Sequence, residues 1–185
     1  MTPAKRPSGR FVLRLPPALH AVLTAAARAR GISLNEHCVR SLSRAEAVTN
    51  RGLTETVARS LEQLGPELVA VAVFGSWARG EAGPSADVDV LVVVAPEVEV
   101  TRSLYGPWDD VDLEIDGHRV EPHFVRMRAT DEPISGLWAE IALDGAIVYD
   151  PGLSLSRELS RIRRAILGGS LVRRSAGGRS WWTAA

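Results

Sequence analysis

The sequence is poor in the residues that would crosslink it or anchor it in a membrane. It has a single cysteine, Cys38, which excludes an internal disulfide framework and, with no second Cys or His at ligand spacing, gives no zinc motif. No stretch approaches the roughly 18 consecutive apolar residues of a membrane span, and MTPAKRPSGR at the N-terminus lacks the apolar core of a signal peptide. We therefore expect a cytoplasmic protein with no membrane partner.

Acidic residues are scarce at both ends of the chain and basic residues are scarce in its middle, although the formal net charge is zero. Residues 1–51 hold 9 Lys/Arg against 2 Asp/Glu, residues 52–150 hold 6 against 19, and residues 151–185 hold 7 against 1. With 185 residues and 45% apolar content, the chain can bury a core as one ordinary domain or two small ones. The basic ends suit a polyanion, and the acidic middle suits divalent cations.

The first 45 residues have the pattern of one short strand and two short helices. Phe11, Leu13 and Leu15 alternate with Arg10, Val12 and Arg14, which is the period of a half-buried strand, before two prolines stop the pattern. Pro17 then opens a helix with one apolar face that ends at Gly31. The S-x-x-E capping box from Ser33 to Glu36 starts a second helix. So small a unit cannot bury enough surface alone, so we expect it to pair with a second copy, strand against strand.

This segment resembles the ribbon-helix-helix repressors and antitoxins of the HicB-like and Arc-like kind. The pattern FxLRLPxxLHxxLxxxAxxxGxSLNE carries the resemblance, which covers Phe11 to Leu42. It implies a homodimer held by the N-terminal ribbon, with the ribbon in the major groove of operator DNA and the second helix's N-terminus on a phosphate. The implied DNA-binding residues are the ribbon residues Arg10, Val12 and Arg14 and the helix-start residues Ser33, Leu34 and Asn35. The alternative is that this module only dimerises the protein, since Val12 offers no hydrogen bond to a base.

A second domain begins after the turn Asn50-Arg51-Gly52. We place a ribbon-helix-helix domain at residues 1–48 and a second domain at residues 52–185. The second domain opens with a helix that ends at Gly65, followed by LVAVAVF at residues 68–74, an unbroken apolar run typical of a central strand. A polar, glycine-containing loop and a second strand at residues 87–94 come next.

Asp87 and Asp89 are two residues apart on that second strand, so we expect both carboxylates on one face. Two like charges placed side by side are costly without a cation. Paired carboxylates can hold two magnesium ions about 4 Å apart, the arrangement that stabilises the entering and leaving oxygens in phosphoryl or nucleotidyl transfer. The alternative for an isolated DxD is a strand that begins at the solvent edge.

The longer segment GSWARGEAGPSADVD resembles the GSxARGxxxxxSDxD signature of the polymerase-β-like nucleotidyltransferases, and particularly of the minimal MNT antitoxins. The resemblance runs from about Leu68 to Asp150, with Ala86 in place of the usual serine. It implies an α+β fold with a mixed sheet flanked by helices, two Mg²⁺ ions (Mn²⁺ as an alternative) and ATP as nucleotide donor. Gly75 and Ser76 would bind the triphosphate, and Asp87 and Asp89 would be catalytic metal ligands. Arg79 either binds phosphate or pairs with Glu81, and the two roles are equally favoured.

The third catalytic carboxylate has two candidates in VDLEIDGHRVEPHFV, which has the pattern of a β-hairpin with Gly117-His118 at its turn. Glu114 lies on the first strand and Glu121 on the second. We predict Glu121 as the third metal ligand, because its sequence context is similar to the family's third-carboxylate strand. His123 shares its side of the strand and could contact substrate, although a structural histidine is more common. Pro122 marks an edge or bulged strand.

The remaining chain fits the same picture. We expect a helix at residues 134–143, a short strand from residue 146, an arginine-rich helix at residues 155–167 and then a flexible tail. Trp181 and Trp182 in that tail should dock on the domain or on a partner.

Together these features predict a DNA-binding nucleotidyltransferase, the antitoxin of a toxin-antitoxin system, which transfers AMP to a HEPN-type toxin and represses its own operon. The alternatives are a nucleotidyltransferase toxin that modifies tRNA, a small-molecule transferase of the aminoglycoside type, and a repressor that only senses nucleotide.

Overall fold

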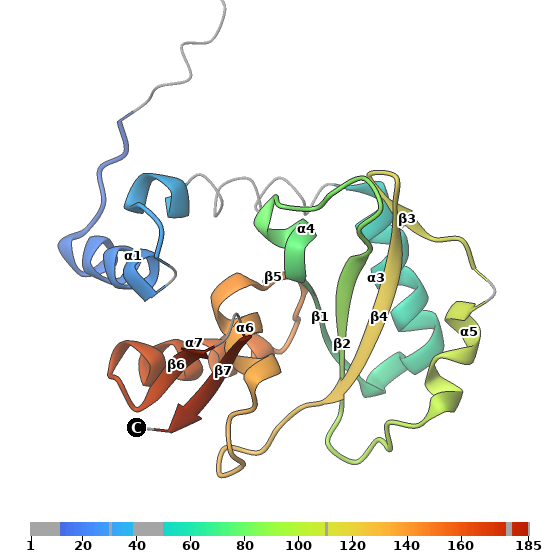
Figure 1. Ribbon diagram of the computed structural model, residues 1–185. Coiled ribbons are helices and arrows are strands. Elements are labelled where there is room, and N and C mark those ends of the chain that lie inside the picture. Colours follow the sequence, from blue (N-terminus) through green and yellow to red (C-terminus); the bar gives the residue numbers. More distant parts are fainter. Residues whose placement is uncertain (1–11, 30, 39–49, 110, 177–178, 185) are drawn as a thin grey trace, which may run out of the picture.

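The computed structural model of the chain describes residues 12–29, 31–38, 50–109, 111–176 and 179–184 (Figure 1). Its centre is a five-stranded mixed sheet in the order β3-β4-β2-β1-β5. The strands of this sheet are β1 (Leu68–Phe74), β2 (Val88–Val94), β3 (Glu114–Ile115), β4 (His118–Arg126) and β5 (Ala146–Tyr149). β2 and β4 run parallel, and the other neighbours run antiparallel.

The helices are α1 (Pro17–Ala29), α3 (Arg51–Leu64), α4 (Gly75–Arg79), α5 (Gly106–Asp109), α6 (Gly136–Asp144) and α7 (Ser154–Leu167), with short 3-10 turns η1 (Gly65–Glu67) and η2 (Arg102–Leu104). Within the described ranges, none of them is long and apolar enough to cross a membrane. The expectation of an α+β fold whose mixed sheet is flanked by helices is confirmed.

The sheet separates two layers of helices, and strand alternation decides which residues face each layer (Figure 1). The even-numbered valines of β2 and Val71 and Val73 of β1 pack with α3 and α5. Leu91 and Val93 of β2 and the alanines of β1 pack with α6 and α7. Asp89 is two residues before Leu91, so its side chain lies on the α6 and α7 face, at the end of the strand.

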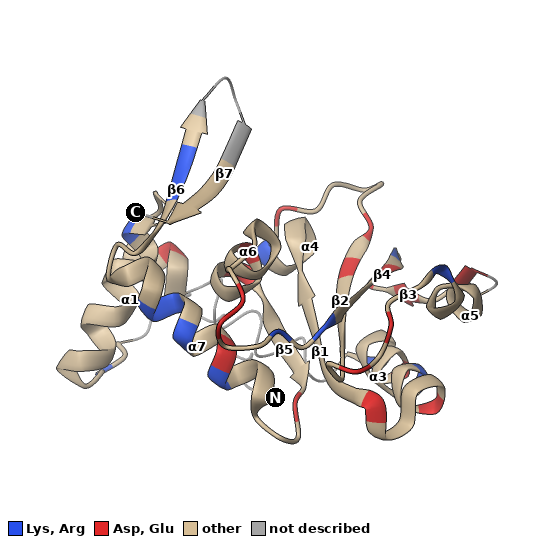
Figure 2. Ribbon diagram, turned by 90° about the horizontal axis from the view of Figure 1, so that it is seen from below, with Lys and Arg blue, Asp and Glu red and all other residues tan. Residues whose placement is uncertain are grey.

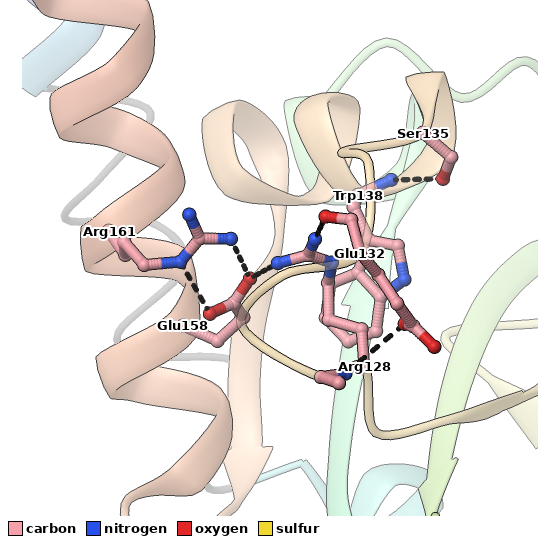
Figure 3. Close-up of polar contacts among 7 residues, drawn as sticks. Arg128, Glu132, Ser135, Trp138, Glu158 and Arg161 are labelled. Carbon is pink, nitrogen blue, oxygen red and sulfur yellow. Dashed lines mark hydrogen bonds and ion pairs between the residues drawn. The ribbon is translucent and has the colours of Figure 1, made fainter.

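α7 is held to the chain after β4 by a buried ion-pair network (Figure 3). Glu158 is buried and accepts hydrogen bonds from Arg128, which is also buried, and from Arg161 at 2.8 and 3.0 Å. Arg128 also donates to the backbone carbonyl of Glu132. Burial by itself raises the pKa of Glu158, but the hydrogen bonds from Arg161 and Arg128 outweigh it and hold the pKa below its ordinary value.

The hairpin turn between β3 and β4 is one residue earlier than the sequence predicts. Asp116 and Gly117 occupy its two central positions with φ of 54° and 78°, whereas His118 already belongs to β4. Positive φ at both positions is the geometry of a type I′ turn, which Asp-Gly favours because its twist matches that of the strands. The prediction of Gly117-His118 as the turn is therefore wrong by one position.

Residues 75–79 were expected in a loop and instead form the short helix α4. Gly80, at φ 71°, ends it in the left-handed conformation, and its N–H donates to the carbonyls of Ser76 and Trp77. A glycine at each end turns the chain sharply, so a single helical turn fits between β1 and the following loop.

The tail is a β-hairpin, which corrects the expectation of a flexible segment. β6 (Leu171–Ala176) pairs antiparallel with β7 (Arg179–Ala184). Trp182 anchors the hairpin, because its Nε1 donates to Glu140 on α6 at 2.8 Å and its ring packs in the core beside α6 and α7. The docking expected of Trp182 is confirmed, whereas Trp181 is 45% exposed.

α1 is present, but the described residues of segment 10–15 do not form the expected strand. The described part of that segment, residues 12–15, has no regular secondary structure, and Val12 is 89% exposed. A strand needs a partner for its backbone hydrogen bonds, and the partner expected here is the same strand of a second copy. α1 and a helical turn at residues 34–38 confirm the rest of the pattern, and α1 packs beside α7.

Candidate active site

Asp89 and Glu121 lie side by side on the two parallel strands at the centre of the site. In the β2 and β4 register Asp89 is opposite Glu121, and both side chains emerge on the face that carries α6 and α7. One carboxylate oxygen from each and a ring nitrogen of His123 all lie within 4.8 Å of one another. Glu121 is exposed, whereas the other two side chains are half-buried. Glu114, the other glutamate considered, lies on β3 and is outside this group.

His123 is bonded directly to Asp89. The distance from its Nε2 to Asp89 Oδ1 is 3.0 Å, and its ring stands edge-on to Phe74 with ring centroids 5.2 Å apart. The hydrogen bond to Asp89 raises the pKa of His123, and the charges of Asp89 and Glu121 add to this effect, although burial acts in the opposite direction. The imidazole therefore shares the electrostatic environment of both carboxylates.

The backbone of Gly75 packs directly against the Asp89 carboxylate. Its φ is 73°, and a Cβ placed on it would come to 2.0 Å from Asp89 Oδ2. Because α4 begins here, the first N–H groups of that helix have no intrahelical acceptor, and Phe74 at the N-cap supplies no side-chain bond. Only glycine lets the backbone at the end of β1 approach Asp89 so closely.

Ser76 and Arg79, the other two residues expected to bind nucleotide, also lie on α4. Ser76 is half-buried in the first turn of this helix. The Arg79 guanidinium bonds Glu81 at 2.6 Å and lies 3.6 Å from Asp144 of α6. Of the two roles left open for Arg79, the structure contains the pairing with Glu81.

Asp87 does not belong to the group of three. It is exposed, it precedes the first residue of β2, and the set of mutually close ligand atoms in the described chain does not include it. The carbonyl of the preceding residue, Ala86, is 2.8 Å from Nδ1 of His118 at the start of β4. The loop that carries Asp87 is thus tied to the same strand that carries Glu121.

The residues present fit a divalent cation. Two carboxylates and an imidazole are ligands for such ions, their donor atoms are close enough to share one, and the Gly75 backbone leaves the space that a side chain would fill. Among the residues described, Asp89 and Glu121 are the pair of predicted ligands that the fold brings together.

Comparison with known families agrees with this geometry. Residues 54–142 match the profile of the nucleotidyltransferase domain, and residues 1–42 match that of the HicB family. The chain carries a polymerase-β-like nucleotidyltransferase domain behind a HicB-family N-terminal region. The nucleotidyltransferase domain includes β1, β2 and β4, and therefore Gly75, Asp89 and Glu121.

The solved structures that match part of the chain include two toxin-antitoxin proteins. One, crystallised with AMP-PNP, is 15% identical, with a TM-score of 0.38 over 60% of this chain and 86% of its own. The other, a mutant of the toxin-antitoxin pair MntA-HpeT, is 11% identical, with a TM-score of 0.38 over 58% of this chain and 82% of its own. No curated protein matches the chain.

The DNA-binding residues predicted in the HicB-family region are only partly described. Arg10 lies outside the described residues, and Val12 and Arg14 are exposed. Ser33 caps the second helix, since its Oγ accepts the N–H of Glu36 at 3.1 Å. Leu34 is half-buried and Asn35 is exposed, both in the first turn of that helix. Their contacts with DNA stay predictions.

Two contacts of the candidate site were not predicted from the sequence. The His118 bond to Ala86 depends on the parallel register of β2 and β4, which no local pattern encodes. The direct bond from His123 to Asp89 has the same origin. The spacing of Glu121 and His123 put both on one side of the strand, but did not say which residue they would face.

Proposed function

We propose that the protein transfers AMP from ATP to a hydroxyl group of a partner toxin and represses its own operon, as the antitoxin of a toxin-antitoxin pair. The observation that carries the catalytic half is the convergence of Asp89 and Glu121 beside Gly75 in a nucleotidyltransferase domain. The HicB-family region in the same chain supports the regulatory half.

In this proposal Asp89 and Glu121, with Asp87 from the adjoining loop, hold the divalent ions. The ions supply positive charge that stabilises the reacting phosphate oxygens. The N–H groups of Gly75 and Ser76 and the Ser76 hydroxyl bind the triphosphate, as N–H groups at a helix start can do. For Arg79 to bind phosphate, it would have to leave Glu81.

The proposed reaction joins the acceptor hydroxyl oxygen to the α-phosphorus of ATP. The bond from that phosphorus to the oxygen bridging the α- and β-phosphates breaks, pyrophosphate leaves, and the acceptor's proton passes to solvent or to a nearby carboxylate. Positioning and charge stabilisation supply most of the catalysis in such transfers.

The test is to incubate the protein with ATP labelled on the α-phosphate, magnesium and lysate, and to compare wild type with Asp87→Asn. Asp109→Asn serves as control, because Asp109 lies on α5, outside the site, and pairs with Arg102 of η2. We expect a labelled protein band with wild type and the control and none with Asp87→Asn. Equal labelling by all three would end the enzyme hypothesis, and labelled tRNA or a labelled small molecule would replace the antitoxin role with one of the alternatives.

A further inference from the structure

The group beside Gly75 contains a nitrogen donor, which a purely carboxylate metal site does not have. His123 belongs to the same set of mutually close donor atoms as Asp89 and Glu121. In the described chain, this is the set of three potential ligands that the fold brings together. Its composition therefore bears on which ion the site accepts.

The spacing of the donors suits joint coordination. Magnesium and first-row metal ions hold oxygen and nitrogen ligands at about 2.1 Å, so ligands at right angles to each other lie about 3.0 Å apart. The distance from His123 Nε2 to Asp89 Oδ1 is 3.0 Å. An ion beside this pair could contact both atoms at their present separation, with the proton of the hydrogen bond released to solvent.

The donors come from rigid parts of the fold and leave one side open. Asp89 and His123 lie on adjacent strands paired from residue 88 to residue 94 of β2, and the His123 ring is braced by Phe74. Their side chains keep 29% and 36% of their surface exposed, and Glu121 is more exposed still. Water or phosphate oxygens can complete the coordination from that side.

We propose that His123 is a direct metal ligand and that the site selects Mn²⁺ over Mg²⁺. Imidazole binds transition metals well, whereas magnesium strongly prefers oxygen ligands and retains its water. A site with one nitrogen and two carboxylates therefore favours manganese. This inference rests on the proposed function in assigning the ion to nucleotidyl transfer, but it can be tested on the protein without nucleotide.

The experiment titrates the full-length protein with MnCl₂ alone and follows free Mn²⁺ by electron paramagnetic resonance, then repeats the titration in competition with MgCl₂. His123→Gln removes the nitrogen and keeps a polar side chain of similar size. His20→Gln, which removes an exposed histidine from α1, is the matched control. Circular dichroism in EDTA checks that both variants remain folded.

We expect His123→Gln to weaken Mn²⁺ binding about tenfold or more while Mg²⁺ binding changes by less than about threefold, and His20→Gln to bind like wild type. Pulsed paramagnetic resonance of bound Mn²⁺ should detect coupling to an imidazole nitrogen that is absent in His123→Gln. Such coupling separates a ligand from a residue that only orients Asp89.

Absence of the nitrogen coupling from wild type, or an equal loss of both metals in His123→Gln, would overturn the inference. If AMP transfer with magnesium persists in either case, the proposed function survives the failure. If the coupling is present but no transfer occurs with either metal, the metal site stands and the proposed function fails.

Discussion

At the scale of single residues, the Asp89 carboxylate occupies the space that a side chain at position 75 would fill. A methyl group there would come to 2.0 Å from Asp89 Oδ2 and force the carboxylate to turn away. We therefore predict that Gly75→Ala lowers the rate of AMP transfer about 100-fold, the loss that a shift of about 1 Å in a catalytic group can cause. Initial rates with labelled ATP measure it.

Gly80→Ala is the matched control for that substitution. Gly80 has nearly the same backbone conformation, with φ of 71°, but nothing lies within 4 Å of its added Cβ. Both variants should lose about 1 kcal/mol of stability from left-handed strain, whereas Gly80→Ala should keep most of the activity. Equal losses of activity would show that backbone strain, and not the collision with Asp89, is responsible.

The two glutamates of the hairpin give a second pair of matched variants. Glu121→Gln removes a charge from the group that contains Asp89, whereas Glu114→Gln changes an exposed residue of β3. We expect transfer to fall about 100-fold or more with Glu121→Gln and less than about twofold with Glu114→Gln. The reverse order would assign the third carboxylate to Glu114.

The sequence predicted which residues converge better than it predicted their contacts. The DxD spacing pointed to Asp89, and the hairpin pattern offered Glu114 and Glu121, of which the resemblance to the family's third-carboxylate strand favoured Glu121. The pairing of Arg79 with Glu81 and the exclusion of Asp87 from the group depend on the conformation of the loop between α4 and β2. A local residue pattern does not encode that conformation.

At the scale of elements, Trp182 holds the β6 and β7 hairpin to α6. Its ring packs in the core beside α6 and α7 and its Nε1 bonds Glu140, whereas the neighbouring Trp181 faces solvent. We predict that Trp182→Ala costs about 2 kcal/mol of unfolding free energy, below the roughly 3–5 kcal/mol of a fully buried aromatic residue. Trp181→Ala should cost less than about 1 kcal/mol. Urea unfolding measures both losses, and a larger loss for Trp181→Ala than for Trp182→Ala would contradict the assignment of Trp182 as the anchor.

The Glu158 network fixes α7, and its contribution should depend on pH. Glu158→Gln leaves Arg128 buried without its carboxylate, so we expect a loss of about 3 kcal/mol at neutral pH. Because the folded-state pKa is lowered, the network's stabilisation is fully present above the ordinary glutamate pKa of about 4.3 and is lost as the pH falls through the folded-state value. The difference between wild type and variant should therefore shrink in acid.

Urea unfolding from pH 7 down to pH 3 measures that dependence. Glu55→Gln provides the control, because Glu55 forms a solvent-exposed pair with Arg51 on α3, and its loss should leave the unfolding free energy nearly unchanged at every pH. A constant difference between wild type and Glu158→Gln across this range would contradict the assignment of the stabilisation to the charged form of Glu158.

Elements with a strong local pattern were predictable, and those that depend on their neighbours were not. The apolar run LVAVAVF specified β1 with its observed bounds, and Gly65 ends α3 as predicted. The prediction of a turn at Asn50-Arg51-Gly52 was wrong, because Asn50 caps α3 and the helix begins at Arg51. The tail shows no clear two-residue alternation of apolar and polar side chains, because its arginines and glycines are typical of solvent-exposed chain. It forms a hairpin because Trp182 finds a site on α6, a contact that lies 42 residues away in the sequence.

At the scale of the whole molecule, basic segments follow α7 and β6 (Figure 2). The basic HicB-family region is expected to bind operator DNA. We predict that Arg10→Ala combined with Arg14→Ala weakens binding to the protein's own promoter about tenfold or more, since a good arginine contact with a base contributes about 1–3 kcal/mol. Mobility-shift titrations at several salt concentrations measure it.

Asp87→Asn should bind the same DNA as wild type does, because it changes only the nucleotidyltransferase domain. If the wild-type protein forms no salt-sensitive complex with its promoter, the HicB-family region has no operator role here and acts in dimerisation alone.

The central claim is that Asp89 and Glu121 converge to serve nucleotidyl transfer, and the position of the label in ATP tests it most directly. Wild type and Asp89→Asn are incubated with lysate, magnesium or manganese, and ATP labelled on either the α- or the γ-phosphate. The account predicts an acceptor labelled by wild type from the α-phosphate alone, with at least about a 100-fold loss in Asp89→Asn. Label from the γ-phosphate, or undiminished labelling by Asp89→Asn, would contradict it.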